Sequence, residues 1–322
     1  MNKLILTKNC EVKLRFKKPF SFERTFYQPS HFQSGLELFV KNKYYTGINL
    51  NNSVYGLKFL FVRNILTLFI YSEKKLSNGD KEKIIKEIYY RFSLLDDYSS
   101  FYDKYSNDKY LKKSIRDNYG KHFSSSYSLY EHLIISTLLQ NTTVKRTVQM
   151  CETLLHNYGT LIEYDGINLF VLWKRENFTA SESELRTLKL GYRAKIITRV
   201  TTELMSDNLS DEKLRLLETN TLVASLLKIY GVGKQTVFYL VMSQFHRTEY
   251  LKHIPLWERK VLSKYLFNKT LLEENKLLKW FNKRYSNWCG YAFSIIWEDI
   301  FHQHKKTPFP WLLKIMKEKE VK

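Results

Sequence analysis

A turn with two glycines between two apolar helical segments is the part of the sequence that most directly suggests chemistry. Residues 226–242 read LLKIYGVGKQTVFYLVM, with Gly231, Val232 and Gly233 at the turn. Both glycines can adopt a positive φ without a Cβ clash, and Val232 can pack between the helices. The helix that follows offers unpaired N–H groups and the positive end of its dipole to a phosphate, and Lys234 adds a charge. The spacing therefore predicts phosphate binding, although a glycine that only caps the first helix gives the same pattern.

The charge of the whole chain favours phosphate binding. The 322 residues include 52 Lys and Arg against 32 Asp and Glu, a formal net charge of +20. Such an excess is typical of proteins whose partner is a polyanion or an anionic membrane surface. The longest apolar stretch, 57–71, is interrupted by Lys58, Arg63 and Asn64 and is shorter than the ~20 residues that a membrane span needs. We therefore predict a nucleic-acid partner, no membrane partner and an intracellular location (cytoplasm or nucleoid, or the nucleus in a eukaryote).

The cysteine and histidine content argues against a metal site. Cys10, Cys151 and Cys289 are far apart and form no C-x-x-C pair, which excludes a zinc ribbon or a four-cysteine iron–sulfur cluster. His302 and His304 form an H-x-H motif without an evident third ligand. We predict neither a metal nor another cofactor.

The pattern of apolar residues changes near residue 80. Before it, segments rich in aromatic and β-branched residues alternate with turn residues, as in an antiparallel sheet; they read VKLRF, LELFV, YYTGI, YGLKFLFV and LTLFIY. After residue 96 every apolar segment has helical spacing, and we expect no strand there. We predict an α+β fold with a small antiparallel sheet in an N-terminal β-rich domain (1–97), followed by a mainly α-helical domain (98–322).

Several further segments, which follow one another along the chain in the order seen in a known family, carry a resemblance to that family. Besides 226–242, they are PFSFERTFYQPSHF (19–32), IISTLLQNTTV (134–144), LKLGYRA (188–194) and WCGYAFSIIW (288–297). Together they resemble the helix-hairpin-helix (HhH-GPD) DNA glycosylase superfamily, nearest its 3-methyladenine and 8-oxoguanine DNA glycosylase branch. The resemblance covers nearly the whole chain. It implies that the helical domain has the glycosylase fold and that the partner is double-stranded DNA containing damaged bases; we expect a monomer.

Members of this family flip a damaged base out of the duplex and cleave its N-glycosidic bond. The resemblance places Gln140 and Asn141 where a side chain fills the gap in the duplex, and Tyr192 near the base pocket. The alternative for Gln140 and Asn141 is simple helix termination, and Tyr192 on a surface turn can merely pack against its neighbours.

Two positions depart from the family pattern. Bifunctional members have a lysine two residues after G-V-G whose amine attacks the sugar, and here that position is Gln235. Lys234 is adjacent, about 100° away around the helix, so we predict a monofunctional glycosylase that uses water. The position of the family's catalytic aspartate is Trp257. The neighbouring Glu258 is our candidate catalytic carboxylate, although it can also serve only to complement the helix dipole. Glu249 is a more distant candidate.

The missing aspartate leaves other function classes open. One alternative is a non-catalytic protein of the same fold that binds duplex DNA or lesions. Another is a single-strand binder that stacks bases on its 23 tyrosines. Our preferred hypothesis is a base-excision repair glycosylase for an alkylated or oxidised base.

Overall fold

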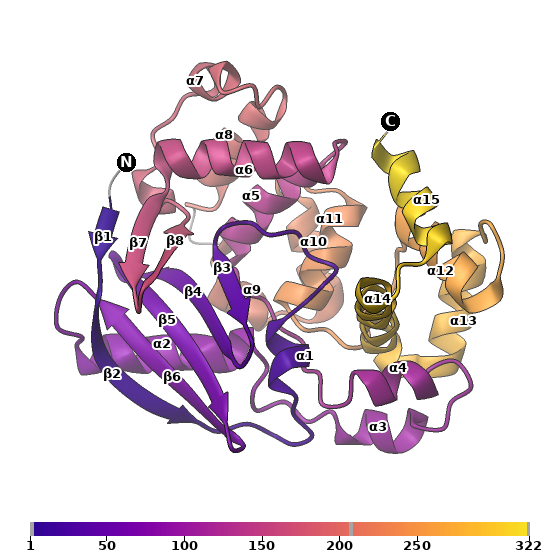
Figure 1. The fold of residues 1–322 in the computed structure, drawn as a ribbon. Helices are drawn as coiled ribbons and strands as arrows, with labels where there is room; N and C mark the ends of the chain where they lie inside the picture. Colours follow the sequence, from indigo (N-terminus) through magenta and orange to yellow (C-terminus); the bar gives the residue numbers. More distant parts are fainter. Residues whose placement is uncertain (1–2, 206–208, 321–322) are drawn as a thin grey trace.

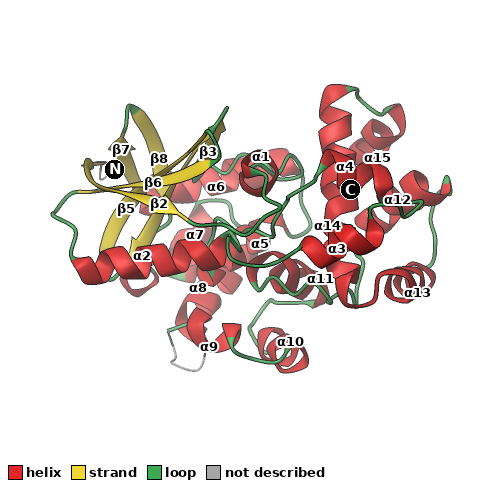
Figure 2. Cartoon of the chain, turned by 90° about the horizontal axis from the view of Figure 1, so that it is seen from below, coloured by secondary structure: helices red, strands yellow, loops and turns green. Residues whose placement is uncertain are grey.

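The computed structural model describes residues 3–205 and 209–320, with the β-sheets at one end of the molecule and helices α12 to α15 at the other (Figures 1 and 2). The larger sheet is antiparallel, with the strand order β2-β6-β5-β4-β3. Its strands are β2 (Thr7–Leu14), β3 (Glu37–Val40), β4 (Lys43–Leu50), β5 (Ser53–Val62) and β6 (Ile65–Ser72). The predicted N-terminal antiparallel sheet is confirmed.

Two-residue turns and one helix explain why this sheet forms. Asn51 and Asn52 join β4 to β5, and Arg63 and Asn64 join β5 to β6; all four have positive φ, as the tightest hairpins require. Helix α2 (Asn78–Arg91) lies along one face of the sheet (Figure 2). Apolar side chains of β5, β6 and α2 interlock there without solvent exposure: Leu57, Phe59, Leu66, Leu68, Ile70, Ile84 and Ile88.

A second sheet contradicts the expectation that no strand follows residue 96. It contains β1 (Lys3–Ile5), β7 (Thr160–Tyr164) and β8 (Ile167–Val171), and β1 pairs in parallel with β7. This sheet packs on β4 and β5 through two glycines. A Cβ on Gly47 would lie 2.2 Å from Val171 Cγ2, and one on Gly56 would lie 2.7 Å from Tyr164 Cδ1. The division of the chain at residue 97 stays a prediction.

Helices form most of the remaining chain, which agrees with the predicted α+β class. They are α1 (Phe22–Phe26), α3 (Ser99–Tyr105), α4 (Lys112–Asp117), α5 (Leu129–Leu139), α6 (Val144–Tyr158), α7 (Glu182–Thr187), α8 (Arg193–Glu203), α9 (Asp211–Arg215), α10 (Thr219–Leu227), α11 (Lys234–Tyr239), α12 (Leu256–Phe267), α13 (Glu274–Tyr285), α14 (Cys289–Lys306) and α15 (Pro310–Glu320). Helix α11 continues as a π-helical segment, Leu240–Gln244. Helices α5 and α14 are buried along most of their length. No helix among the described residues is long and apolar enough to cross a membrane.

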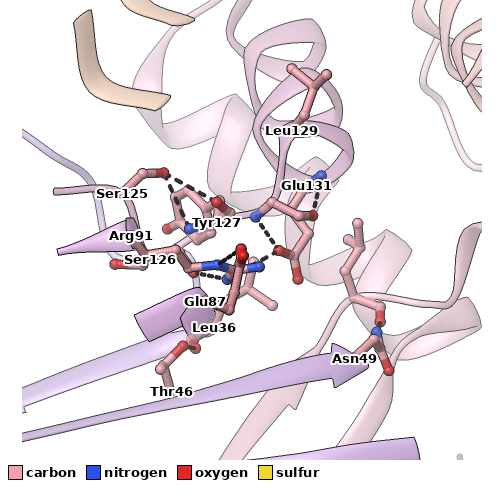
Figure 3. Close-up of polar contacts among 12 residues, drawn as sticks. Leu36, Thr46, Asn49, Glu87, Arg91, Ser125, Ser126, Tyr127, Leu129 and Glu131 are labelled. Carbon is pink, nitrogen blue, oxygen red and sulfur yellow. Dashed lines mark hydrogen bonds and ion pairs between the residues drawn. The ribbon is translucent and has the colours of Figure 1, made fainter. Parts of the chain in front are cut away.

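A buried ion-pair cluster joins α2 to the helical part of the chain (Figure 3). Arg91 donates to Glu87 Oε1 at 2.7 Å and to the carbonyl oxygen of Ser126 at 2.8 Å. Glu87 also accepts two hydrogen bonds from Arg215 of α9, at 2.7 and 2.8 Å. Burial alone would raise the pKa of Glu87, but the two arginines outweigh it and hold that pKa at about 2.

This cluster predicts a pH dependence of stability. Because the pKa of Glu87 is depressed on folding, its contribution is present above its unfolded pKa near 4.5 and is lost as the pH falls towards 2. Burial raises the pKa values of Glu131 and Asp211 in the same cluster, so the contribution of these two groups to stability changes with pH in the opposite direction. Urea denaturation of wild type and Glu87→Gln at pH 7 and pH 3 isolates the contribution of Glu87 to the free energy of unfolding. The stability gap between the two proteins should be larger at pH 7, and an equal gap at both values would contradict the prediction.

Candidate functional site

The two glycines of the turn between α10 and α11 have different conformations. Gly231 has φ +77°, and a Cβ there would lie 2.6 Å from Ile196 Cγ2. Gly233 has φ −103° and ψ 178°, and a Cβ there would meet nothing within 4 Å. The expectation of positive φ at both positions is therefore wrong for Gly233. Its position as N-cap of α11, with open space around it, instead leaves the first N–H groups of the helix accessible.

The rest of the hairpin combines one buried residue with several exposed cations. Val232 is 8 % exposed and belongs to the main core, as its place between the glycines predicts. Lys234 is exposed. On the neighbouring α8, Arg199 lies 4.3 Å and Lys195 5.9 Å from the ring centre of Tyr230. The hairpin thus presents free backbone donors within a positively charged surface, the combination that binds phosphate.

The turn between α5 and α6 contacts this hairpin directly. Gln140 Nε2 donates to the carbonyl oxygen of Gly231 at 3.1 Å. The Tyr192 hydroxyl donates to the carbonyl oxygen of Gln140 at 3.2 Å and accepts from Asn141 Nδ2 at 3.4 Å, and Arg193 also donates to that carbonyl. Asn141 itself is exposed, with φ +46°. Three groups of residues that the sequence singles out separately are therefore in contact.

A cleft of about 1560 Å³ lies between these turns and the C-terminal helices. Six of the predicted site residues line it: Gln140, Asn141, Gly231, Gly233, Gln235 and Trp257. Val232, Lys234, Tyr192 and Glu258 lie outside its lining. Among the side chains that the structure describes, the charged residues of the lining are all basic, namely Arg146, Lys260, Lys314 and Lys317. The cleft therefore favours an anionic ligand.

Trp257 gives the cleft an aromatic wall. Its ring centre lies 5.2 Å from that of Trp297 and 6.0 Å from that of Phe301, both on α14. Phe293 of the same helix stacks on Trp297 at 5.8 Å. The position at which the family resemblance implies an aspartate thus belongs to an aromatic cluster, and its member Trp257 lines the cleft, where its ring offers a planar ligand a stacking surface.

Glu258 lies one layer behind the cleft. It is 3 % exposed and accepts a hydrogen bond from the hydroxyl of Tyr239, which does line the cleft. Burial and then the Glu258 carboxylate raise the pKa of Tyr239 well above its usual value, whereas a hydrogen bond with Gln235 lowers it. Tyr239 therefore stays protonated at neutral pH and connects Glu258 to the cleft. The sequence analysis missed Tyr239, whose position one turn after Gln235 on the same helix is the available signal.

Three other carboxylates that the sequence places near these segments make hydrogen bonds outside the cleft lining. Glu249 is exposed and accepts from Thr219 at 2.6 Å. On α14, Glu298 accepts from Ser30 at 2.6 Å and Asp299 accepts from Ser114 at 2.8 Å. None of these three carboxylates lines the cleft.

No family model matches the chain, but curated relatives do. The chain is 24 % identical over 182 residues to the DNA-3-methyladenine glycosylase of Bacillus subtilis, and the aligned residues cover 56 % of this chain and 60 % of that protein. It is 36 % identical over 81 residues to the N-glycosylase/DNA lyase of Saccharomyces cerevisiae, which covers 24 % of this chain and 22 % of that protein. The chain thus matches less than two thirds of the length of either relative.

Solved structures show the fold over almost the whole chain. The 3-methyladenine DNA glycosylase of Archaeoglobus fulgidus matches 91 % of it with a TM-score of 0.72 and 16 % identity, covering 99 % of that structure. The 8-oxoguanine glycosylase/lyase of Clostridium acetobutylicum, in complex with double-stranded DNA containing cytosine opposite 8-oxoG, matches 96 % with a TM-score of 0.69 and 16 % identity, covering 100 % of that structure. The resemblance expected from the sequence is confirmed.

Proposed function

We propose that this chain, which has the fold of the 3-methyladenine and 8-oxoguanine DNA glycosylases, is a base-excision repair glycosylase. It would flip an alkylated or oxidised base out of double-stranded DNA and hydrolyse its N-glycosidic bond, acting as a monomer. One observation supports this proposal: a single cleft, lined by basic charges alone within the described part of the chain, joins the glycine hairpin, the Gln140–Asn141 turn and the aromatic ring of Trp257.

Each part of the cleft has a role in this proposal. The N–H groups at Gly233 and Lys234 hold a phosphate of the DNA backbone, while the buried Val232 fixes the hairpin to the core. Asn141, exposed at the tip of its turn, fills the gap left by the flipped nucleotide. Gln140 and Tyr192 hold that turn against the hairpin. The extruded base stacks on the aromatic wall at Trp257.

The catalytic step in this proposal needs a negative charge near the sugar. Cleavage of the glycosidic bond builds positive charge on the sugar ring, which a carboxylate in a water-poor site stabilises. Glu258 supplies that charge and acts through Tyr239, which donates to it and lines the cleft. Water is the nucleophile, because the amide of Gln235 cannot form a Schiff base. No metal or cofactor takes part.

The experiment that tests this function is a panel of duplexes, each with one alkylated or oxidised base, incubated with the protein and analysed for free base. Release of free base from at least one lesion is the expected result. The position of Trp257 favours one second candidate, a non-catalytic lesion-binding protein of the same fold. Tight binding of a lesion duplex without base release would support that candidate.

We expect no covalent intermediate between the protein and DNA. Gln235 lines the cleft where bifunctional members have their lysine, and Lys234 is exposed outside the lining. Borohydride added during reaction with a lesion duplex should therefore trap no protein–DNA adduct on a denaturing gel. A trapped band that is lost in Lys234→Ala would show that Lys234 reaches the sugar and that the enzyme is also a lyase.

A further inference from the structure

We propose that the C-terminal helix α15 is a second DNA-binding element, whose Lys314 and Lys317 contact backbone phosphates on the side of the cleft opposite the hairpin. This inference rests on the proposed function and extends it. The hairpin alone holds the duplex at one edge of the cleft, and α15 would hold it at the other.

Helix α15 forms a wall of the cleft. It contributes Pro310, Leu313, Lys314, Ile315 and Lys317 to the lining. Figure 1 shows it (yellow) beside α12, across from α11 and the start of α6. A duplex that reaches the hairpin through the cleft therefore passes the exposed lysines of α15.

The helix is anchored, so its lysines have a defined direction. Leu312 has no solvent exposure and belongs to the main core. Just before α15, the backbone N–H of Phe309 donates to His304 Nδ1 at 2.9 Å, and the Phe309 ring stacks on Trp311 with 5.5 Å between ring centres. Because residues three apart share a helix face, Lys314 and Lys317 point to the same side. A solvated tail would have none of these contacts.

The charge of the cleft identifies DNA as the ligand of this wall. Lys314 and Lys317 face a cavity whose other charged lining residues, Arg146 and Lys260, are also basic. Among the side chains that the structure describes, no carboxylate lines this cavity, and its basic residues attract a polyanion. A DNA backbone supplies several phosphates at once, and it is already placed in this cleft by the hairpin in the proposed function.

A pair of matched double variants tests the inference. Lys314→Gln/Lys317→Gln removes two charges from the cleft wall. Lys276→Gln/Lys279→Gln removes two exposed charges with the same spacing from α13, outside the cleft lining. Fluorescence anisotropy with an undamaged duplex, measured over a range of KCl concentrations, gives the slope of log affinity against log salt. Each lost phosphate contact reduces this slope by about 0.9.

We expect the α15 variant to bind more weakly and its salt slope to fall by about 1.8, while the α13 variant behaves as wild type. Equal slopes in the two variants would overturn the inference, and so would tighter binding by the α15 variant, which would make α15 an obstruction. A wild-type protein that binds no duplex, or whose binding does not depend on salt, would instead overturn the proposed function itself. Melting temperatures of both variants exclude an effect through folding.

Discussion

Replacing Glu258 by Gln is expected to lower base release by about 10²-fold or more, while binding of the lesion duplex is retained. The amide has nearly the same volume as the carboxylate and still accepts from the Tyr239 hydroxyl, so the geometry is preserved. The negative charge is lost, and with it the stabilisation of the positive sugar in the transition state. Single-turnover base release and duplex affinity, measured on the same preparation, separate the two effects.

Two companion variants make this result specific. Glu249→Gln removes an exposed carboxylate outside the cleft lining and should leave base release unchanged. Tyr239→Phe removes the hydroxyl that connects Glu258 to the cleft, and we expect a smaller loss of base release with retained affinity. If Glu258→Gln keeps wild-type activity, Glu258 is a structural carboxylate. Glu298 and Asp299 on α14 are then the next candidates for the catalytic carboxylate.

The parts of the fold and site that the sequence predicts are those that depend on neighbouring residues. The predicted strand segments YGLKFLFV and LTLFIY form β5 and β6, which the two-residue turn Arg63–Asn64 joins. Val232 is the only apolar side chain of the turn between the two glycines, and it is buried in the core between the two helices. In each case the short-range pattern and the tertiary contact favour the same structure.

The parts that could not be predicted depend on contacts between distant segments. The segment 160–171 has strand-like apolar residues around an Asp165-Gly166 turn, but its place in a sheet depends on β1, more than 150 residues earlier. The contact between Tyr239 and Glu258 requires α11 and α12 to pack together. The apolar spacing of residues 311–317 indicates a helix, but that this helix forms a wall of the cleft depends on its packing against the distant core.

The two glycines of the hairpin should respond to alanine in opposite ways, and this is the second large effect that we expect. Gly231→Ala places a Cβ at φ +77° and 2.6 Å from Ile196 Cγ2. Strain at positive φ costs about 1–2 kcal/mol, and the forced shift of a packed side chain adds about 1–3 kcal/mol. We therefore expect a loss of roughly 2–5 kcal/mol in the free energy of unfolding, measured by urea denaturation.

Gly233→Ala should leave the free energy of unfolding nearly unchanged, because its φ of −103° suits alanine and its Cβ meets no atom within 4 Å. The new methyl group occupies the open space in front of the first N–H groups of α11, where the proposed function places a backbone phosphate. Duplex affinity should consequently fall at least tenfold, the effect of losing about 1.4 kcal/mol of binding free energy. Gly191→Ala is an unsuitable control because of its positive φ, whereas Ser225→Ala changes a half-buried position on α10, outside the cleft lining, and should leave affinity unaltered. A stable Gly233→Ala protein with wild-type affinity would mean that the hairpin only connects two helices and that DNA binds elsewhere on the basic surface.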